Sequence, residues 1–198
     1  IVANSLTYQH NDGSTEEVLA FLDDQENIVK IEEKFSDADT RNSGKRIFYF
    51  ENSKKFMTVE LFMDNKDSKG AFRERVSYYN KNETVKSSKD RLAPFEEDLE
   101  KMEFKKIGHY DCSVKRAMAV LNNEGVFKTT FQGFLENGYM TYLLVGGPGE
   151  SGYATAIAVQ YDDSQITKLK KNTLKYINKP LKVKFERMLD EKNMEFQV

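Results

Sequence analysis

The sequence predicts a strand-dominated α+β protein, and three observations support this class. Apolar and polar residues alternate through most of residues 1–93, as they do in half-buried strands. Helix signals then occupy residues 94–125. Residues 126–198 have the element order strand, strand, strand, helix, strand, strand, which can close into a small five-stranded barrel. We therefore expect three segments with these boundaries: an antiparallel meander of hairpins, a connection of two helices, and a barrel with one helix.

The first segment contains a repeated hairpin signal. Alternating runs, such as the one through Met57, Val59 and Leu61, are separated by turns rich in Asn, Asp and Ser. Three aromatic strand ends begin 28 and 29 residues apart, and a polar turn follows each: Phe21-Leu22-Asp23-Asp24, Tyr49-Phe50-Glu51-Asn52 and Tyr78-Tyr79-Asn80. Self-similarity at a period of this length predicts stacked copies of one supersecondary unit.

Over residues 15–90 this layout resembles the MORN-like β-hairpin repeat proteins, in which an aromatic strand end meets a polar turn. The resemblance implies an extended antiparallel sheet and assigns no site residues. The chain departs from that family in its glycines, because only Gly44 and Gly70 lie near these hairpins and neither lies in a turn. An ordinary β-meander is the alternative interpretation of the same pattern.

The connection carries two helix signals. Pro94 is followed by an acidic run, and this combination is typical of a helix start. The apolar stripe of this helix has spacings of four and three: Phe95, Leu99 and Met102. A second helix is expected to begin near Asp111 or Ser113 and to end before Gly125. Its expected inward residues are Ala117, Met118 and Leu121.

The last segment alternates again. Its expected strands are Val126–Leu135, Tyr139–Val145, Tyr153–Gln160, Leu181–Met188 and Met194–Val198. Asn137-Gly138 between the first two is a strong hairpin-turn signal. A helix is expected over Ser164–Ile177, with Asp163 or Ser164 as its cap.

This element order is similar to the OB-fold, a family of small barrels that bind oligonucleotides, oligosaccharides or proteins. The resemblance implies a ligand face on the second and third strands, flanked by the loops at Asn137-Gly138 and Asp190–Asn193. The residues expected to contact a ligand are Asn137, Tyr142, Tyr153, Lys182 and Lys184. Nucleic acid is a poor candidate ligand, because the charges near this face include Glu136, Glu150 and Asp162.

Composition restricts the partner further. The chain has a formal net charge of −2, whereas domains that bind nucleic acids usually show a strong basic excess. The lysines between Lys168 and Lys184 could form a polyanion-binding face, but Lys182 and Lys184 alternate with apolar residues and fit a solvated strand face better. No apolar run is long enough for a membrane span. Because the chain begins at Ile1 without Met, we expect a secreted or periplasmic bacterial protein or a trimmed chain.

Two motifs suggest chemistry, and each has a simpler interpretation. His109 lies three residues before Cys112, and a Cys–His pair can form a nucleophile, but a lone Cys is more often a small buried side chain. Gly147–Gly152 fits the dinucleotide pattern G-x-G-x-x-G, which requires a following helix. The next residues alternate as a strand does, so we expect a hairpin loop without a cofactor. No metal is expected either, because His10, His109 and Cys112 do not have zinc spacing.

The sequence therefore predicts a non-enzymatic binding or interaction protein with an unknown protein or saccharide ligand and no cofactor. Two alternatives remain open. One is a polyanion or nucleic-acid-binding module, and the other is an enzyme that uses His109 and Cys112.

Overall fold

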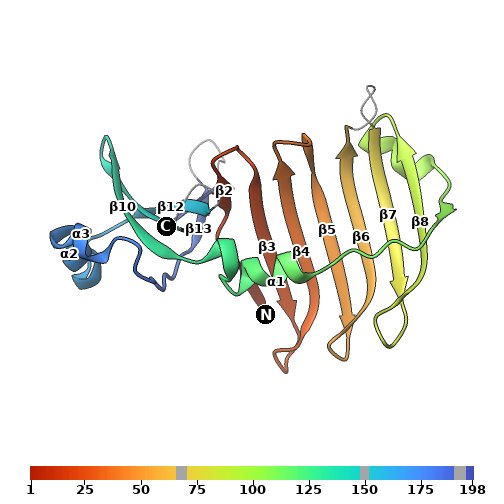
Figure 1. The fold of residues 1–198 in the computed structure, drawn as a ribbon, viewed down its shortest axis with the longest axis horizontal. Helices are drawn as coiled ribbons and strands as arrows, with labels where there is room; N and C mark the ends of the chain where they lie inside the picture. The colour runs from red at the N-terminus through yellow and green to blue at the C-terminus, as the bar shows by residue number, and fades with distance from the viewer. Residues whose placement is uncertain (66–70, 148–151, 190–194) are drawn as a thin grey trace. The chain divides into compact units, whose positions relative to one another are not determined.

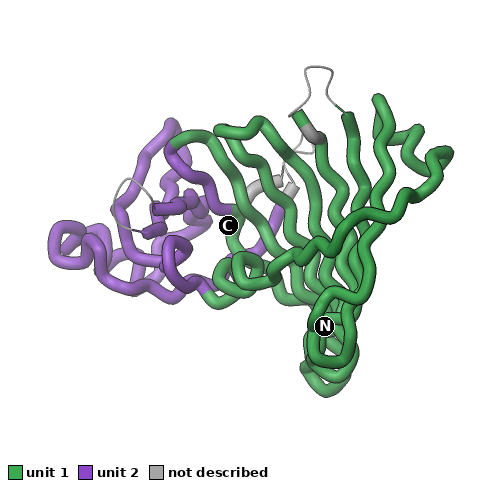
Figure 2. The backbone as a smooth tube through the Cα atoms, turned by 45° about the vertical axis from the view of Figure 1, so that its right-hand side comes forward, with its two compact units in different colours: residues 1–7, 12–122 green, residues 8–11, 123–198 purple. Residues whose placement is uncertain are grey.

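A computed structural model describes residues 1–65, 71–147, 152–189 and 195–198 of the chain. It contains two compact units (Figure 2). Unit 1 comprises residues 1–7 and 12–122, and unit 2 comprises residues 8–11 and 123–198.

Unit 1 is built on a large antiparallel sheet (Figure 1). Strands β3 to β9 pair with their neighbours in sequence order, and β1 pairs with β3. The bounds of these strands are β1 Val2–Asn4, β3 Thr15–Leu22, β4 Ile28–Asp37, β5 Asn42–Glu51, β6 Lys54–Asp64, β7 Ala71–Tyr79, β8 Val85–Ala93 and β9 Lys105–Ile107. The predicted antiparallel sheet of hairpins is confirmed.

Each predicted aromatic strand end carries a β-bulge. The register shifts fall at the same position in the three repeats: Phe21/Leu22, Tyr49/Phe50 and Tyr78/Tyr79. The first and third turns are also alike, since Glu26 and Glu83 both take the left-handed conformation, with φ of 62° and 60°. The middle turn is shorter and consists of Asn52 and Ser53, both with positive φ. Two consecutive residues with positive φ are typical of a type I′ hairpin turn, whose twist matches that of the strands.

The connection differs from its prediction in detail. Its first helix is a short 3-10 helix, η1 (Glu96–Lys101), that buries Leu99 alone of the expected stripe, because Phe95 and Met102 lie at its caps, outside the helix. Phe95 and Met102 are exposed. The second helix, α1 (Lys115–Leu121), begins after the expected positions and buries Ala117 and Val120.

Residues 108–114, which we call the strap, run across the strands of unit 1 between β9 and α1 (Figure 1). The strap and α1 cover one face of the sheet. We call this the covered face, and it carries Val18, Ile31 and Phe48, which are all fully buried. The opposite face, the open face, carries Ile47, Tyr49, Val59 and Tyr78. Only η1 packs on the open face among the helices described in unit 1.

Unit 2 has a smaller antiparallel sheet in the order β10-β11-β12-β2. Its strands are β10 Thr130–Asn137, β11 Met140–Gly146, β12 Tyr153–Val159 and β2 Tyr8–His10. The remaining elements are η2 Gly125–Phe127, α2 Ser164–Lys171, α3 Thr173–Tyr176, β13 Arg187–Leu189 and β14 Glu195–Gln197. The predicted hairpin around Gly138 is present, with φ of 62° at this glycine.

The predicted five-stranded OB-like barrel is wrong, because the sheet does not close. The last two strands pair with each other in a separate two-stranded sheet. At the outer edge of β10 the returning chain makes only a short stretch of pairing, centred on a bridge between Thr130 and Pro180. Backbone hydrogen bonds flank the bridge, from the Phe131 N–H to the Lys179 carbonyl at 2.9 Å and from the Leu181 N–H to the Thr129 carbonyl at 3.0 Å. Leu181–Glu186, predicted as most of a strand, lack strand pairing and form only terminal backbone contacts.

The predicted helix over Ser164–Ile177 forms as two pieces. Asp163 caps α2, since its carboxylate accepts a hydrogen bond of 2.7 Å from the Ile166 backbone N–H. Asn172 then interrupts the helix with a φ of −133°. The segment after the glycine motif is the strand β12, as predicted, so no helix follows that loop among the described residues. Residues 148–151 of the motif and the predicted turn at 190–193 lie outside the described residues.

Candidate binding surface on the hairpin sheet

The hairpin repeats align three aromatic residues on the open face. Phe21, Tyr49 and Tyr78 belong to one continuous row, with Lys30 and Met57 directly opposite them on the intervening strands. The three aromatics are therefore two strands apart. Because neighbouring strands lie about 4.8 Å apart, successive aromatic side chains are separated by about 10 Å.

This row is accessible. The Tyr78 side chain is 37% exposed, and Phe21 and Tyr49 are half-buried. Phe56, which is 41% exposed, enlarges the surface because its ring lies 6.3 Å from that of Tyr49. Exposed aromatic residues in line on one face mark candidate ligand sites more strongly than scattered apolar residues do.

Polar groups accompany the aromatic row. The Lys30 ammonium lies 3.8 Å from the centre of the Phe21 ring and 2.9 Å from the Glu32 carboxylate. Lys89 lies 5.7 Å from the centre of the Tyr78 ring. These cations thus sit at the ring faces, where they can also donate hydrogen bonds to a ligand placed on the row.

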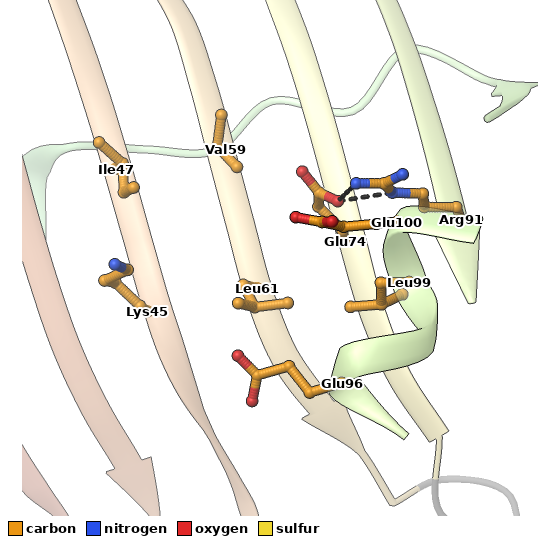
Figure 3. Close-up of a pocket in the computed structure, with 9 residues that line it drawn as sticks. All are labelled: Lys45, Ile47, Val59, Leu61, Glu74, Arg91, Glu96, Leu99 and Glu100. Atoms are coloured by element: carbon orange, nitrogen blue, oxygen red, sulfur yellow. Dashed lines mark hydrogen bonds and ion pairs between the residues drawn. The ribbon is translucent and has the colours of Figure 1, made fainter. Parts of the chain in front are cut away.

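A shallow hollow of about 260 Å³ lies beside the row (Figure 3). Its floor is apolar and includes Ile47, Val59 and Leu61, and Leu99 of η1 points toward it. Arg91 donates to Glu74 at its rim, with 2.6 Å between Nε and the carboxylate oxygen. Two acids of η1, Glu96 and Glu100, complete the rim.

The covered face instead carries a row of buried charges. Opposite charges alternate across five neighbouring strands in the order Glu33, Arg46, Glu60, Arg75 and Asp90. Arg46 contacts Glu33 at 3.1 Å and Glu60 at 3.2 Å, and Arg75 contacts Glu60 at 3.5 Å. Buried charges need such partners, so we assign this row a structural role.

The strap closes over this charged row. The ring of Tyr110 stacks on the Arg75 guanidinium at 3.8 Å, and its hydroxyl donates to Glu60 at 3.5 Å. Lys55 is almost fully buried, and its ammonium donates to the Cys112 carbonyl at 2.6 Å. The Cys112 backbone N–H donates to the Tyr79 hydroxyl at 3.0 Å.

These contacts bear on the predicted Cys–His alternative. Cys112 is 5% exposed, whereas the His109 side chain is exposed. Burial, and then the negative charge of Glu60, raise the pKa of the Cys112 thiol far above its usual value. A protonated thiol is a poor nucleophile, so this environment does not suit the role that the Cys–His pair would require.

One acidic pair under α1 is unusual. Glu16 and Glu33 are 2% and 1% exposed, and when both are ionised one carboxylate oxygen of each receives no hydrogen bond from the described residues. Arg116 of α1 donates to the other oxygen of Glu16 at 2.6 Å. Burial, and then hydrogen bonding to Glu33 and its charge, raise the pKa of Glu16 to about 8, although Arg116 opposes the shift. The Glu16 carboxyl can therefore be protonated at neutral pH and donate a hydrogen bond to Glu33.

The residues predicted from the OB-like pattern are distributed over unit 2. Tyr153 packs between Phe127 and His10, at ring distances of 4.7 and 5.1 Å. Tyr142 is half-buried opposite Ala158, and Asn137 is exposed at the end of β10. Only Lys182 and Lys184 line the same groove.

From the sequence, the repeated aromatic residues are predicted only as strand ends, and no binding surface is predicted for them. The signal that could have found the surface is the repeat period itself. The nearly equal spacing of Phe21, Tyr49 and Tyr78 in successive hairpins, 28 and 29 residues, places them at the same height in the sheet. No comparable pattern in the sequence predicts that the strap covers the other face of the sheet.

Comparisons with protein-family models, curated proteins and solved structures found no match to this chain. Within the described parts of the chain, no group of three or more His, Cys, Asp or Glu side chains is arranged to hold a metal ion. None of the helices described is long and apolar enough to cross a membrane.

Proposed function

We propose that this protein is a non-catalytic binding module and that the open face of unit 1 binds an extended, neutral glycan. The observation that carries the proposal is the row of Phe21, Tyr49 and Tyr78 at a spacing of about 10 Å. This spacing is close to the length of one disaccharide unit in an extended β-linked glycan. Every second sugar of such a chain can then lie on an aromatic ring.

The chemistry of the surface supports this ligand class. A pyranose ring has a face of C–H groups, which packs on an aromatic face, and hydroxyls around its edge. Lys30, Glu32 and Lys89 lie beside the aromatic rings and can exchange hydrogen bonds with those hydroxyls. The sheet also twists from strand to strand, so a single glycan chain that can follow the twist fits better than a flat crystalline surface.

The charges of the open face argue against a polyanion as the ligand. Lys30 is paired with Glu32, Lys34 lies 3.7 Å from Glu17, and Arg91 is paired with Glu74. Cations that are neutralised by neighbouring acids create little net attraction for phosphate or sulfate groups. We therefore favour a neutral polyhydroxylated chain over a nucleic acid.

The test is calorimetric titration of the full chain with a β-1,4-linked glucose hexasaccharide. We expect binding to the unaltered protein and a loss of about tenfold or more with Tyr49→Ala, which corresponds to about 1.4 kcal/mol. Tyr49→Phe keeps the ring and should retain most of the affinity. Tyr139→Ala, at a fully exposed site in unit 2, is the matched control and should bind as the unaltered protein does.

Parallel titrations with single-stranded DNA and with heparin distinguish the polyanion alternative. Salt-sensitive binding to either of these, with none to the hexasaccharide, would contradict the proposal. Equal hexasaccharide binding by the Tyr49→Ala and Tyr139→Ala variants would contradict the assignment to the open face.

A further inference from the structure

The hollow of about 260 Å³ lies on the same strands as the aromatic row, at the next positions along them. On β6, Val59 follows Met57 of the row on the open face, and Leu61 follows Val59. Ile47 of β5 lies directly opposite Val59. Since a strand rises about 3.4 Å per residue, the floor of the hollow lies about 7 to 14 Å from the row. A glycan on the row crosses the strands, so a substituent at its side can reach the hollow.

The floor of the hollow is apolar and accessible to solvent. Ile47, Val59 and Leu61 are half-buried, whereas Leu99 of η1 is 3% exposed and forms a wall beside them. Figure 3 shows the side chains of Leu61 and Leu99 directed toward each other. A hydroxyl group pressed against this floor would lose hydrogen bonds to water without replacement, which is unfavourable. A methyl group buries apolar surface there and is favoured.

The rim of the hollow offers both kinds of polar group that an amide requires. Glu96 and Glu100 of η1 are exposed acceptors, and Lys45 is a half-buried donor. None of these three side chains has an ion-pair partner in the described part of the chain, so their hydrogen-bonding capacity is available. A neutral amide donates through its N–H and accepts through its carbonyl, so it matches the acids and the lysine together.

We infer that the glycan on the open face is a β-1,4-linked chain of N-acetylglucosamine and that the hollow binds the acetamido group of one of its sugars. The methyl of this group lies on the apolar floor, its N–H donates to Glu96 or Glu100, and its carbonyl accepts from Lys45. An apolar site with a few placed polar groups is the usual form of a small-ligand site.

The repeat of such a chain agrees with the aromatic row. Successive sugars in a β-1,4-linked chain face opposite ways, so every second acetamido group projects to the same side. Every second sugar is also the one that lies on an aromatic ring of the row. This inference rests on the proposed function and adds the substituent that its ligand carries.

The test compares two β-1,4-linked hexasaccharides, one of N-acetylglucosamine and one of glucose, by calorimetric titration of the full chain. We expect the acetylated chain to bind about tenfold more tightly or better, from the buried methyl and the amide hydrogen bonds. Leu61→Gln makes the floor polar without altering the aromatic row. This variant should reduce the preference to less than about threefold, and its unchanged affinity for the glucose chain would show that it is folded.

Met63→Gln is the matched control. Met63 lies on the same face of β6 as Leu61 but does not line the hollow. This variant should keep the full preference for the acetylated chain. A preference that survives equally in Leu61→Gln would contradict binding of the acetamido group in the hollow.

The results that would overturn this inference differ from those that would overturn glycan binding itself. Equal affinity for the two chains would remove the role of the hollow and leave binding by the open face intact. Tighter, salt-sensitive binding of the fully deacetylated glucosamine hexasaccharide would show that the acids of η1 select a cation, which also overturns the inference. Failure of both neutral chains to bind would contradict the proposed function together with this inference.

Discussion

At the residue scale, Glu16 couples the stability of unit 1 to pH. Its carboxyl is buried beside Glu33 and is held by Arg116 of α1. The pKa of Glu16 is raised to about 8 in the folded chain, from an ordinary value of 4.5. Between these two pH values the folded chain binds more protons at this site than the unfolded chain. Folding is therefore favoured by Glu16 protonation, and this contribution is lost as the pH rises through about 8.

The first prediction concerns this titration. We expect the free energy of unfolding to acquire a slope of up to about −1.4 kcal/mol per pH unit from this one proton as the pH rises from 5 to 8. Glu16→Gln should remove that slope, because an amide does not titrate in this range. The slope is measured by urea unfolding of both proteins at a series of pH values.

Glu17→Gln is the matched control, since Glu17 lies next to Glu16 in β3 but faces the open side of the sheet beside Lys34. This variant should keep the slope of the unaltered protein. A slope that survives in Glu16→Gln would show that another group is responsible.

At the element scale, the hairpin turns carry backbone strain in different amounts. Ser53 has a φ of 60° in the two-residue turn between β5 and β6, a position at which glycine is preferred. Glu83 also has a φ of 60°, but its carboxylate accepts a hydrogen bond of 3.0 Å from the Lys55 backbone N–H. The cost of the left-handed conformation is thus offset by a hydrogen bond at Glu83, whereas no hydrogen bond of the Ser53 side chain to the described residues offsets it.

The second prediction compares these two turns. Ser53→Gly should stabilise the protein by about 0.5–1 kcal/mol, since it relieves the left-handed conformation at no cost in contacts. The expected increase in Tm is about 1–4 °C for a chain of this size. Glu83→Gly relieves the same conformation but leaves the Lys55 N–H without its acceptor, so it should give no increase. Calorimetric melting measures both. Equal increases for the two variants would contradict this account.

At the scale of unit 1 as a whole, the strap and α1 together join strands that are distant in the sheet. Ser77 of β7 donates its hydroxyl to the Tyr110 carbonyl at 2.8 Å, and Lys55 of β6 donates to the Cys112 carbonyl. Helix α1 continues the crossing as far as Glu16 of β3. Release of the strap would expose several buried charges at once, so we expect it to detach only when the sheet unfolds.

The third prediction uses Cys112 as a reporter of this detachment. Alkylation of the buried thiol by iodoacetamide should be slow in the native protein and limited by opening of the strap. Lys55→Met leaves the buried Cys112 carbonyl without its donor and should cost about 1–3 kcal/mol. The alkylation rate should rise accordingly, by about fivefold to more than a hundredfold.

Asp111→Asn provides the control for this experiment. Asp111 also contacts the Lys55 ammonium, at 3.1 Å, but its side chain is 63% exposed. Lys55 is almost fully buried, so loss of the Asp111 charge should cost some stability. The asparagine oxygen can still accept a hydrogen bond from the ammonium, so we expect a smaller loss than for Lys55→Met. Rapid alkylation of the unaltered protein would contradict the burial of the strap.

The sequence by itself determined the hairpin sheet of unit 1. Period-two alternation and the recurring aromatic strand ends specify antiparallel strands and their turns locally, because both signals arise from neighbouring residues. The cap at Asp163 and the strand after the glycine motif were predictable for the same reason. The aromatic row of the candidate site follows from the repeat once the strands are in register.

Only the tertiary structure decided which face of that sheet is covered and whether the sheet of unit 2 closes. In β6 the polar Thr58 and Glu60 are buried under the strap, whereas the alternating apolar Met57 and Val59 lie on the open face. Alternation reveals that two faces differ, but it does not reveal where a later segment will pack. Closure depended likewise on a distant contact, because the pairing of the chain near Pro180 with β10 is confined to the bridge to Thr130 and the few backbone hydrogen bonds beside it. Long-range pairing of this kind is fixed by packing and by which backbone groups remain free, and neither property is encoded in a local sequence period.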